Sequence, residues 1–178
     1  MAQLQSRFCP EDALIRNELG VLGGRRRVDV VCVNGHLDGW EIKSDVDTLR
    51  RLVGQAQAFS GVLDRATLVT TDRHLHHATE LLPPWWGVQR AALTRAGNVR
   101  LTYIRRPRQS PSLDPMALAQ LLWRAEALDE LRRRGLAHGL SNKSRWYVWE
   151  RLAESLAITD LRSLVRNTLR ARQQWPGG

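Results

Sequence analysis

Cysteine is scarce in this sequence, and long apolar runs are missing. The two cysteines, Cys9 and Cys32, lie in segments that resemble a chain terminus and a buried strand, so they predict neither a metal knuckle nor a disulfide framework. No run of 18 apolar residues occurs, which excludes a membrane-spanning helix. The amino terminus lacks the charged-then-apolar order of a secretion signal. We therefore expect a cytoplasmic protein in a reducing compartment, with no membrane partner.

Lysine is equally scarce. Lys43 and Lys143 are the only lysines among 27 basic residues, which leaves 25 arginines, and the formal net charge is +9. This balance favours a polyanionic partner, although basicity alone does not distinguish nucleic acid from an anionic membrane surface. The arginine bias fits phosphate recognition, and genome composition explains it equally well.

The length and composition predict one good core with a helical appendage. The chain has 178 residues, of which 43% are hydrophobic. Residues 105–112 form a linker by their proline, serine and charge content. We therefore expect a core at residues 1–110 and a basic helical extension at residues 111–178. Amphipathic helices are predicted within 115–134 and 144–173.

The pattern of the first 110 residues predicts an α/β core. Residues 10–20 indicate a short helix, with proline near its start and glycine at its end. Valine-rich residues 26–33 and residues 36–43 indicate a β-hairpin around Asn34 and Gly35. The following pattern predicts a helix at 45–63 that is capped at Ser44-Asp45, a strand at 65–70 parallel to the hairpin, a helix at 72–82, and strands at 87–93 and 99–104.

The hairpin carries the most informative polar residues: Asp29, Glu41 and Lys43. Glu41 and Lys43 are two apart on one strand, so both side chains leave the same face of the sheet. Asp29 joins them if it lies opposite Glu41, which requires Val33 opposite Leu37 and a three-residue loop. Two carboxylates that hold Mg²⁺, with a lysine beside them, can activate water and neutralise a phosphodiester. The plain alternative is an exposed cross-strand ion pair.

This segment resembles the core of the PD-(D/E)xK phosphodiesterase superfamily, and specifically a small bacterial family within it. The likeness lies in residues 27–30, 40–45, 47–52 and 82–87, and in Gln55 with Phe59. It implies a restriction-endonuclease-like fold, in which a mixed central sheet is flanked by helices, here with a C-terminal α-helical extension. It also implies a Mg²⁺- or Mn²⁺-dependent nuclease that hydrolyses nucleic acid, which we expect to be DNA, although the sequence does not distinguish DNA from RNA.

The resemblance assigns roles to individual residues. Asp29 and Glu41 would bind the metal with the backbone carbonyl of Ile42, and Lys43 would orient the water. Glu18 would match an acidic residue on the first helix of the superfamily, although it could equally be a solvated helix residue. Gln55 would contact the site, although a plain boundary glutamine explains it almost as well.

Several basic residues are candidates for nucleic-acid binding. They are Arg26, Arg27, Arg132, Arg133, Arg134, Lys143 and Arg145. Two other functions remain open: a non-catalytic nucleic-acid-binding subunit on the same fold, and a helix-turn-helix regulator built from residues 115–173. The C-terminal helices could also hold a second copy or a partner protein. Trp85 and Trp86 could stack on bases, or close the helix that ends at Pro83-Pro84.

Overall fold

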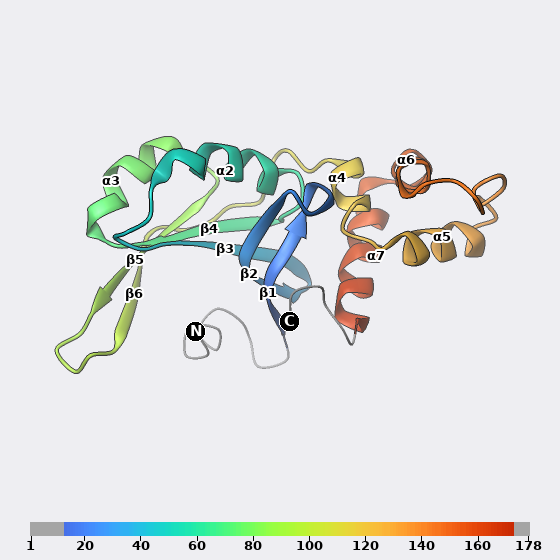
Figure 1. The fold of residues 1–178 in the computed structure, drawn as a ribbon. Coiled ribbons are helices and arrows are strands. Elements are labelled where there is room, and N and C mark those ends of the chain that lie inside the picture. The colour runs from blue at the N-terminus through green and yellow to red at the C-terminus, as the bar shows by residue number, and fades with distance from the viewer. Residues whose placement is uncertain (1–12, 173–178) are drawn as a thin grey trace.

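The computed structural model describes residues 13–172 as a six-stranded mixed sheet with helices (Figure 1). The strands lie in sequence order, and they are β1 (Leu14–Val21), β2 (Arg26–Asn34), β3 (His36–Lys43), β4 (Arg65–Thr70), β5 (Gly87–Leu93) and β6 (Val99–Arg105). The β1–β2, β2–β3 and β5–β6 pairs are antiparallel, and β3, β4 and β5 are parallel. The predicted mixed α/β sheet with flanking helices is therefore confirmed.

Helices α2 (Leu52–Ser60) and α3 (Asp72–Leu81) cover one face of the sheet. Beyond the sheet follow α4 (Pro115–Ala119), α5 (Arg124–Arg133), α6 (Arg145–Ser155) and α7 (Ile158–Ala171), which gather beside β1 and β2 (Figure 1). The β5–β6 hairpin extends from the opposite end of the molecule (Figure 1). Within residues 13–172, no helix is long and apolar enough to cross a membrane.

One large hydrophobic cluster joins the sheet to the C-terminal helices. It includes Val31 and Leu68 from the sheet, Phe59 from α2, and Trp149 and Val165 from the C-terminal helices. A smaller cluster that includes Val30, Cys32, Trp40 and Val69 is distinct from it. The division near residue 110 stays a prediction, and a shared core lies across it.

The helix expected at residues 10–20 is wrong for the part that the structure describes. Residues 14–21 form β1, which pairs with β2 through contacts such as Leu19 with Val28. Leu19 and Val21 are buried at a spacing of two, as in a strand. The proline and glycine cues resemble helix ends, but pairing with β2, which follows after a short turn, outweighs these signals.

The helix expected from residue 45 begins later. A short 3₁₀ turn, η2 (Leu49–Arg51), leads into α2. The Asp47 carboxylate accepts hydrogen bonds from the Ser44 amide (2.7 Å) and hydroxyl (2.6 Å). Ser44 therefore closes a turn with Asp47 and does not cap a helix.

The cysteine expectation also needs correction. Cys32 is disulfide-bonded, and Cys9 lies outside the described residues. A single pair of cysteines has no spacing pattern that would reveal such a bond. The cysteine content therefore gives no support to the expected reducing compartment.

Candidate nucleic-acid interface

The predicted hairpin register is confirmed. Val33 lies opposite Leu37, and Gly35 occupies the loop with a φ of 64°. Glycine is the residue that tolerates this left-handed conformation best. The register brings Asp29, Glu41 and Lys43 to one polar cavity of about 480 Å³.

Within this cavity, Glu41 belongs to a buried polar network. Its Oε1 accepts hydrogen bonds from Lys43 Nζ (2.6 Å) and Gln55 Nε2 (2.5 Å). Glu41 and Lys43 are only 2% and 5% exposed. Burial raises the pKa of the Glu41 carboxyl, and the hydrogen bond from Lys43 opposes that rise. The two residues form a buried ion pair, which differs from the exposed pair considered as the plain alternative.

Asp29 and Glu18 line the same cavity but are held separately. Asp29 accepts a hydrogen bond from the Ile42 amide (2.7 Å), and burial raises the pKa of its carboxyl. The Ile42 group that contacts Asp29 is thus its amide N–H, and not the carbonyl that was the candidate metal ligand. Glu18 lies on β1 with a φ of 56°, and it pairs with Arg27 at 3.0 Å. The expected position of Glu18 on a first helix is wrong.

Three consecutive arginines lie beside this cavity. Arg25, Arg26 and Arg27 follow the turn η1 (Leu22–Gly24), which connects β1 to β2, and all three are exposed. Gly23 and Gly24 have φ values of 65° and 93°, in the region that favours glycine. These glycines permit the tight turn that projects the three arginines from the edge of the sheet.

A second basic segment lies at the start of α6, where two cations precede two aromatic rings. The Lys143 ammonium is 5.3 Å from the centre of the Tyr147 ring, and the Arg145 guanidinium is 5.8 Å from that of Trp146. Trp146 is 44% exposed and Tyr147 is 54% exposed. Exposed cations beside exposed rings are suited to phosphates and bases.

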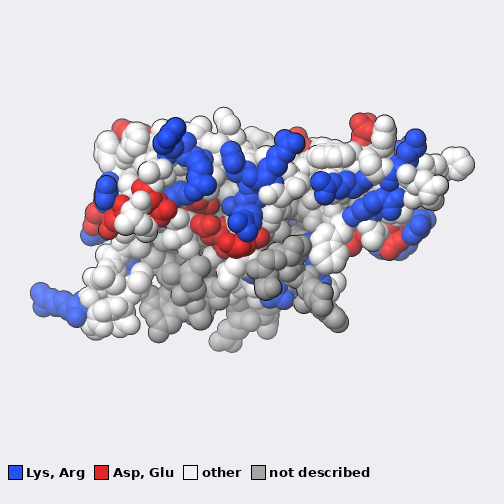
Figure 2. Space-filling model, viewed as in Figure 1, with Lys and Arg blue, Asp and Glu red and all other residues white. Residues whose placement is uncertain are grey.

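These two basic segments are neighbours in space. A Cβ built on Gly23 would lie 3.9 Å from the Trp146 ring. Arg27 and Arg145 also line one cavity of about 610 Å³ between the sheet and the helices. In Figure 2, basic side chains gather from the middle of the visible face toward the C-terminal helices. We call this region the basic–aromatic surface, and it comprises Arg25, Arg26, Arg27, Lys143, Arg145, Trp146 and Tyr147.

The Arg132–Arg134 run is engaged differently. Arg132 pairs with Asp129 at 2.8 Å, and Arg133 and Arg134 each pair with Glu130 at 2.7 Å. These carboxylates belong to the same helix and offset much of the positive charge. The positive potential around Arg132–Arg134 is therefore weaker than the sequence suggests. The role of these arginines in nucleic-acid binding stays a prediction.

Two of the three arginines of α7 contact a carboxylate of the protein itself. Arg162 and Arg166 lie 2.6 Å and 3.5 Å from the buried Asp64. Arg172, which follows the helix, lies 2.5 Å from Glu126. Only two residues join α6 to α7, so a helix-turn-helix protein would present α7 to DNA. Because two of its three arginines are engaged internally, α7 supports that function less well than the basic–aromatic surface does.

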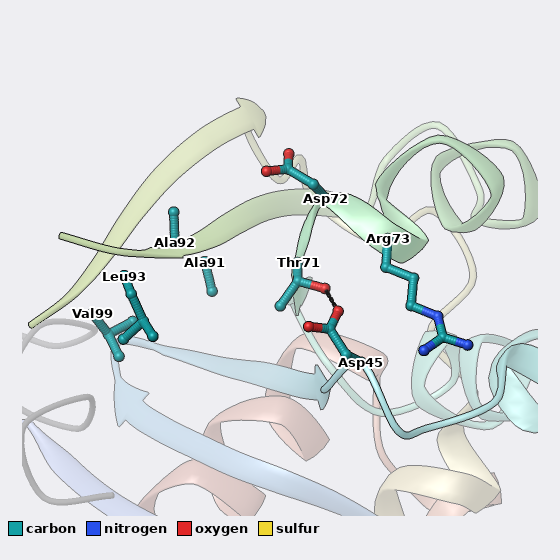
Figure 3. A pocket seen from close by; sticks show the side chains of 8 residues that line it. All are labelled: Asp45, Thr71, Asp72, Arg73, Ala91, Ala92, Leu93 and Val99. Carbon is teal, nitrogen blue, oxygen red and sulfur yellow. Dashed lines mark hydrogen bonds between the residues drawn. The ribbon is translucent and has the colours of Figure 1, made fainter. Parts of the chain in front are cut away.

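Another cavity, of about 580 Å³, lies where the β5–β6 hairpin leaves the sheet (Figure 3). Asp45, Asp72 and Arg73 line it beside small and apolar side chains of the hairpin (Figure 3). The Thr71 hydroxyl donates to Asp45, and Arg90 donates to Asp72 at 2.7 Å. Two carboxylates against one lining arginine make this cavity a poor match for a polyanion.

Comparison with known proteins establishes the family. The model of the family described as Bacteriophage P4 protein cII matches residues 1–175. The chain belongs to this family. It is 29% identical over 161 residues to Protein cII of Enterobacteria phage P4, and the match covers 90% of this chain. The chain spans about 60% of the length of that curated relative. No solved structure matches it.

Membership of the cII family corrects the resemblance drawn from the hairpin. The identification with the PD-(D/E)xK superfamily is wrong, and so are the nuclease, hydrolase and enzyme assignments that depended on it. The family match extends over nearly the whole chain, whereas the resemblance used a few short motifs. Asp29, Glu41 and Lys43 do line one cavity. The hairpin register and the buried ion pair between Glu41 and Lys43 are sufficient to explain this arrangement. Among the described residues, no group of three or more His, Cys, Asp or Glu side chains could hold a metal ion.

The cII-family structure also shows which candidates were missed. Arg26, Arg27, Lys143 and Arg145 were predicted, and they lie on the basic–aromatic surface. Arg25, Trp146 and Tyr147 were not predicted, although the presence of two aromatic residues directly after the basic residues of 143–145 was a usable signal. Trp85 and Trp86 are buried at 8% and 0% exposure, so they belong to the core.

Proposed function

We propose that this cII-family chain is a non-catalytic nucleic-acid-binding protein. It acts by occupying nucleic acid, in the manner of a regulator, and not by cutting it. The observation that carries the proposal is the close approach of Gly23 to the Trp146 ring, because it brings two basic segments together into one surface. Arg25–Arg27 would provide phosphate contacts on one side of this junction, and Lys143 and Arg145 on the other.

The electrostatics of the surface support this function. Within residues 13–172, Arg25, Arg26, Lys143 and Arg145 have no carboxylate within ion-pair distance. Their charge is therefore available to an external anion, whereas Arg162 and Arg166 of α7 are engaged internally. Arginine presents a planar fork that binds phosphate in a bidentate manner. Each phosphate contact releases counterions, so binding should weaken steeply as salt increases.

The test measures the salt dependence of binding. Labelled single-stranded and duplex DNA and RNA are titrated with wild type and with the triple variant Arg25→Ala/Arg26→Ala/Arg145→Ala, and fluorescence anisotropy is read over a salt series. Each lost phosphate contact should reduce the slope of log affinity against log salt by roughly 0.7 to 0.9. The triple variant loses three such contacts, so its slope should be shallower by roughly 2.1 to 2.7.

The matched control is Arg73→Ala/Arg95→Ala/Arg100→Ala, which removes the same formal charge from exposed positions elsewhere. It should retain the wild-type slope. Equal loss in both variants would show that net charge, and not this surface, governs binding. Binding of wild type to anionic vesicles but to none of the nucleic acids would assign the surface to a membrane and reject the proposal.

A further inference from the structure

Two adjacent aromatic rings on the basic–aromatic surface are exposed. Trp40, Trp85, Trp86 and Trp149 are buried at 8% exposure or less, whereas Trp146, like Trp123, is 44% exposed. Tyr147, the next residue along the chain, is 54% exposed. Burying a large ring normally stabilises a fold substantially, so two adjacent exposed rings within a field of cations indicate a contact surface for an external molecule.

Trp146 is held in place even though it is exposed. Its ring meets the Trp149 ring edge-on, with 5.2 Å between the centroids and an interplanar angle of 90°. Trp149 is itself fixed, because it is buried and its Nε1 donates to the Leu122 carbonyl at 3.0 Å. A ring that is already ordered loses little side-chain entropy when a ligand covers it.

The segment before the rings is also fixed. The Arg124 side chain donates to the Ser141 carbonyl at 2.6 Å and to the Lys143 carbonyl at 3.0 Å. These bonds hold the loop that positions Lys143 near Tyr147. Arg124 thus acts as a positioning residue for the start of α6.

We propose that the ligand of this surface is single-stranded nucleic acid, whose unpaired bases stack on Trp146 and Tyr147. The inference rests on the proposed function and narrows it to a substrate class. In a duplex, the flat faces of the bases are covered by their neighbours, so only phosphates and groove edges are accessible to a protein. In a single strand, each base can present a face to an aromatic ring while its phosphates contact nearby cations.

The arrangement of charge fits a strand that crosses the surface. Arg145 and Lys143 lie beside the two rings, where the phosphates of stacked nucleotides would lie. On the other side of the Gly23–Trp146 contact, Arg25–Arg27 would continue the path of the backbone. Bases and phosphates of one strand would thereby meet rings and cations in alternation.

The experiment compares one labelled strand of about 16 nucleotides, as DNA and as RNA, with the same strand annealed to its complement. Wild type should bind the single strand more tightly than the duplex. Trp146→Ala and Tyr147→Ala should each weaken single-strand binding by roughly 5- to 150-fold, the loss expected for one stacked base, and should leave duplex binding unchanged. Trp146→Phe, which keeps a ring, should recover part of the affinity.

Tyr103→Ala is the matched control. Tyr103 is 39% exposed and has Arg106 5.2 Å from its ring centre, but it lies on the β5–β6 hairpin at the other end of the molecule. It should bind like wild type. Thermal unfolding of each variant shows whether the fold is retained, and the more exposed Tyr147 provides the test if Trp146→Ala unfolds.

Three outcomes would overturn the inference, and they differ in meaning. Equal or tighter binding of duplex, or unchanged single-strand binding by folded ring variants, rejects the single-strand inference. If the triple arginine variant still loses affinity in that case, the proposed function survives. Failure of wild type to bind any of the nucleic acids rejects both proposals.

Discussion

At the scale of single residues, the most consequential feature is the buried pair between Glu41 and Lys43. Both side chains are nearly inaccessible, and their charged atoms lie 2.6 Å apart. Such a pair does not by itself indicate a stabilising interaction, because removing two charges from water is costly. Losing only one partner is a different matter, because it leaves the other charge buried and uncompensated.

We therefore expect Lys43→Met to lower the free energy of unfolding by about 3–5 kcal/mol. The double variant Glu41→Gln/Lys43→Met should recover much of this loss, because no charge is left unpaired. Denaturant unfolding of the two single variants and the double variant gives the coupling energy. The control is Arg27→Met, whose partner Glu18 is exposed, and it should cost no more than about 1 kcal/mol. Strictly additive losses at positions 41 and 43 would contradict the coupling.

Asp29 and Glu41 should also make stability depend on pH. Burial raises the pKa of both carboxyls in the folded chain, so each binds protons more strongly when folded than when unfolded. The resulting stabilisation is fully present below the unfolded pKa and is lost as the pH rises through the folded pKa. The free energy of unfolding of wild type should therefore decline as the pH rises. We expect the double variant Asp29→Asn/Glu41→Gln to lose this decline when the free energy of unfolding is measured between about pH 4 and about pH 8.

Asp47→Asn provides a control of opposite sign. Hydrogen bonds from Ser44 lower the pKa of the Asp47 carboxyl, so its contribution is present above the unfolded pKa and is lost as the pH falls. Removing it should eliminate a rise in stability with pH. A decline in stability that persists in the Asp29→Asn/Glu41→Gln variant would show that other groups cause it.

At the scale of secondary-structure elements, local sequence predicted most of the sheet. The β2–β3 hairpin, β4, α3 and the β5–β6 hairpin follow from turn residues and apolar periodicity. β1 was missed because its proline and glycine cues resemble helix ends, and because the short turn at Leu22–Gly24, which folds β1 back onto β2 as a hairpin, was not predicted. The site was predicted only in part. The arginines could be predicted from the sequence, but the approach of Gly23 to Trp146 could not, because it depends on how α6 packs.

Close packing between elements explains one glycine of β3. A Cβ on Gly39 would lie 2.4 Å from Leu63 Cδ1 and 3.0 Å from Val28 Cγ1, so the site has no room for a methyl group. Gly39→Ala should therefore destabilise the fold by about 1–3 kcal/mol through overpacking. Gly54→Ala in α2 is the control, because its nearest neighbour is 3.9 Å away, and it should be neutral or stabilise by up to about 1 kcal/mol. Equal denaturation midpoints for the two variants would contradict the packing argument.

At the scale of the whole molecule, Asp64 links the sheet to the C-terminal helices. This buried carboxylate accepts a hydrogen bond from the Leu37 amide at 2.8 Å, and it binds Arg162 and Arg166 of α7. The hydrophobic cluster follows the same route, because residues of the sheet and of α4–α7 belong to it together. We expect the two parts to unfold in one transition, because neither part can lose the shared core without exposing apolar surface of the other.

Asp64→Asn should test this coupling. The substitution leaves Arg162 and Arg166 without their common counterion. Breaking a fully buried pair lowers the free energy of unfolding by about 3–5 kcal/mol. The loss here should be somewhat smaller, because both arginines are partly exposed. For a chain of this length, each kcal/mol lowers Tm by roughly 2–4 °C. Calorimetry should show a single transition at a lower Tm. Asp72→Asn, whose pair with Arg90 is exposed, should leave Tm nearly unchanged. Two separate transitions in wild type would show instead that the sheet and the helical extension are independent domains.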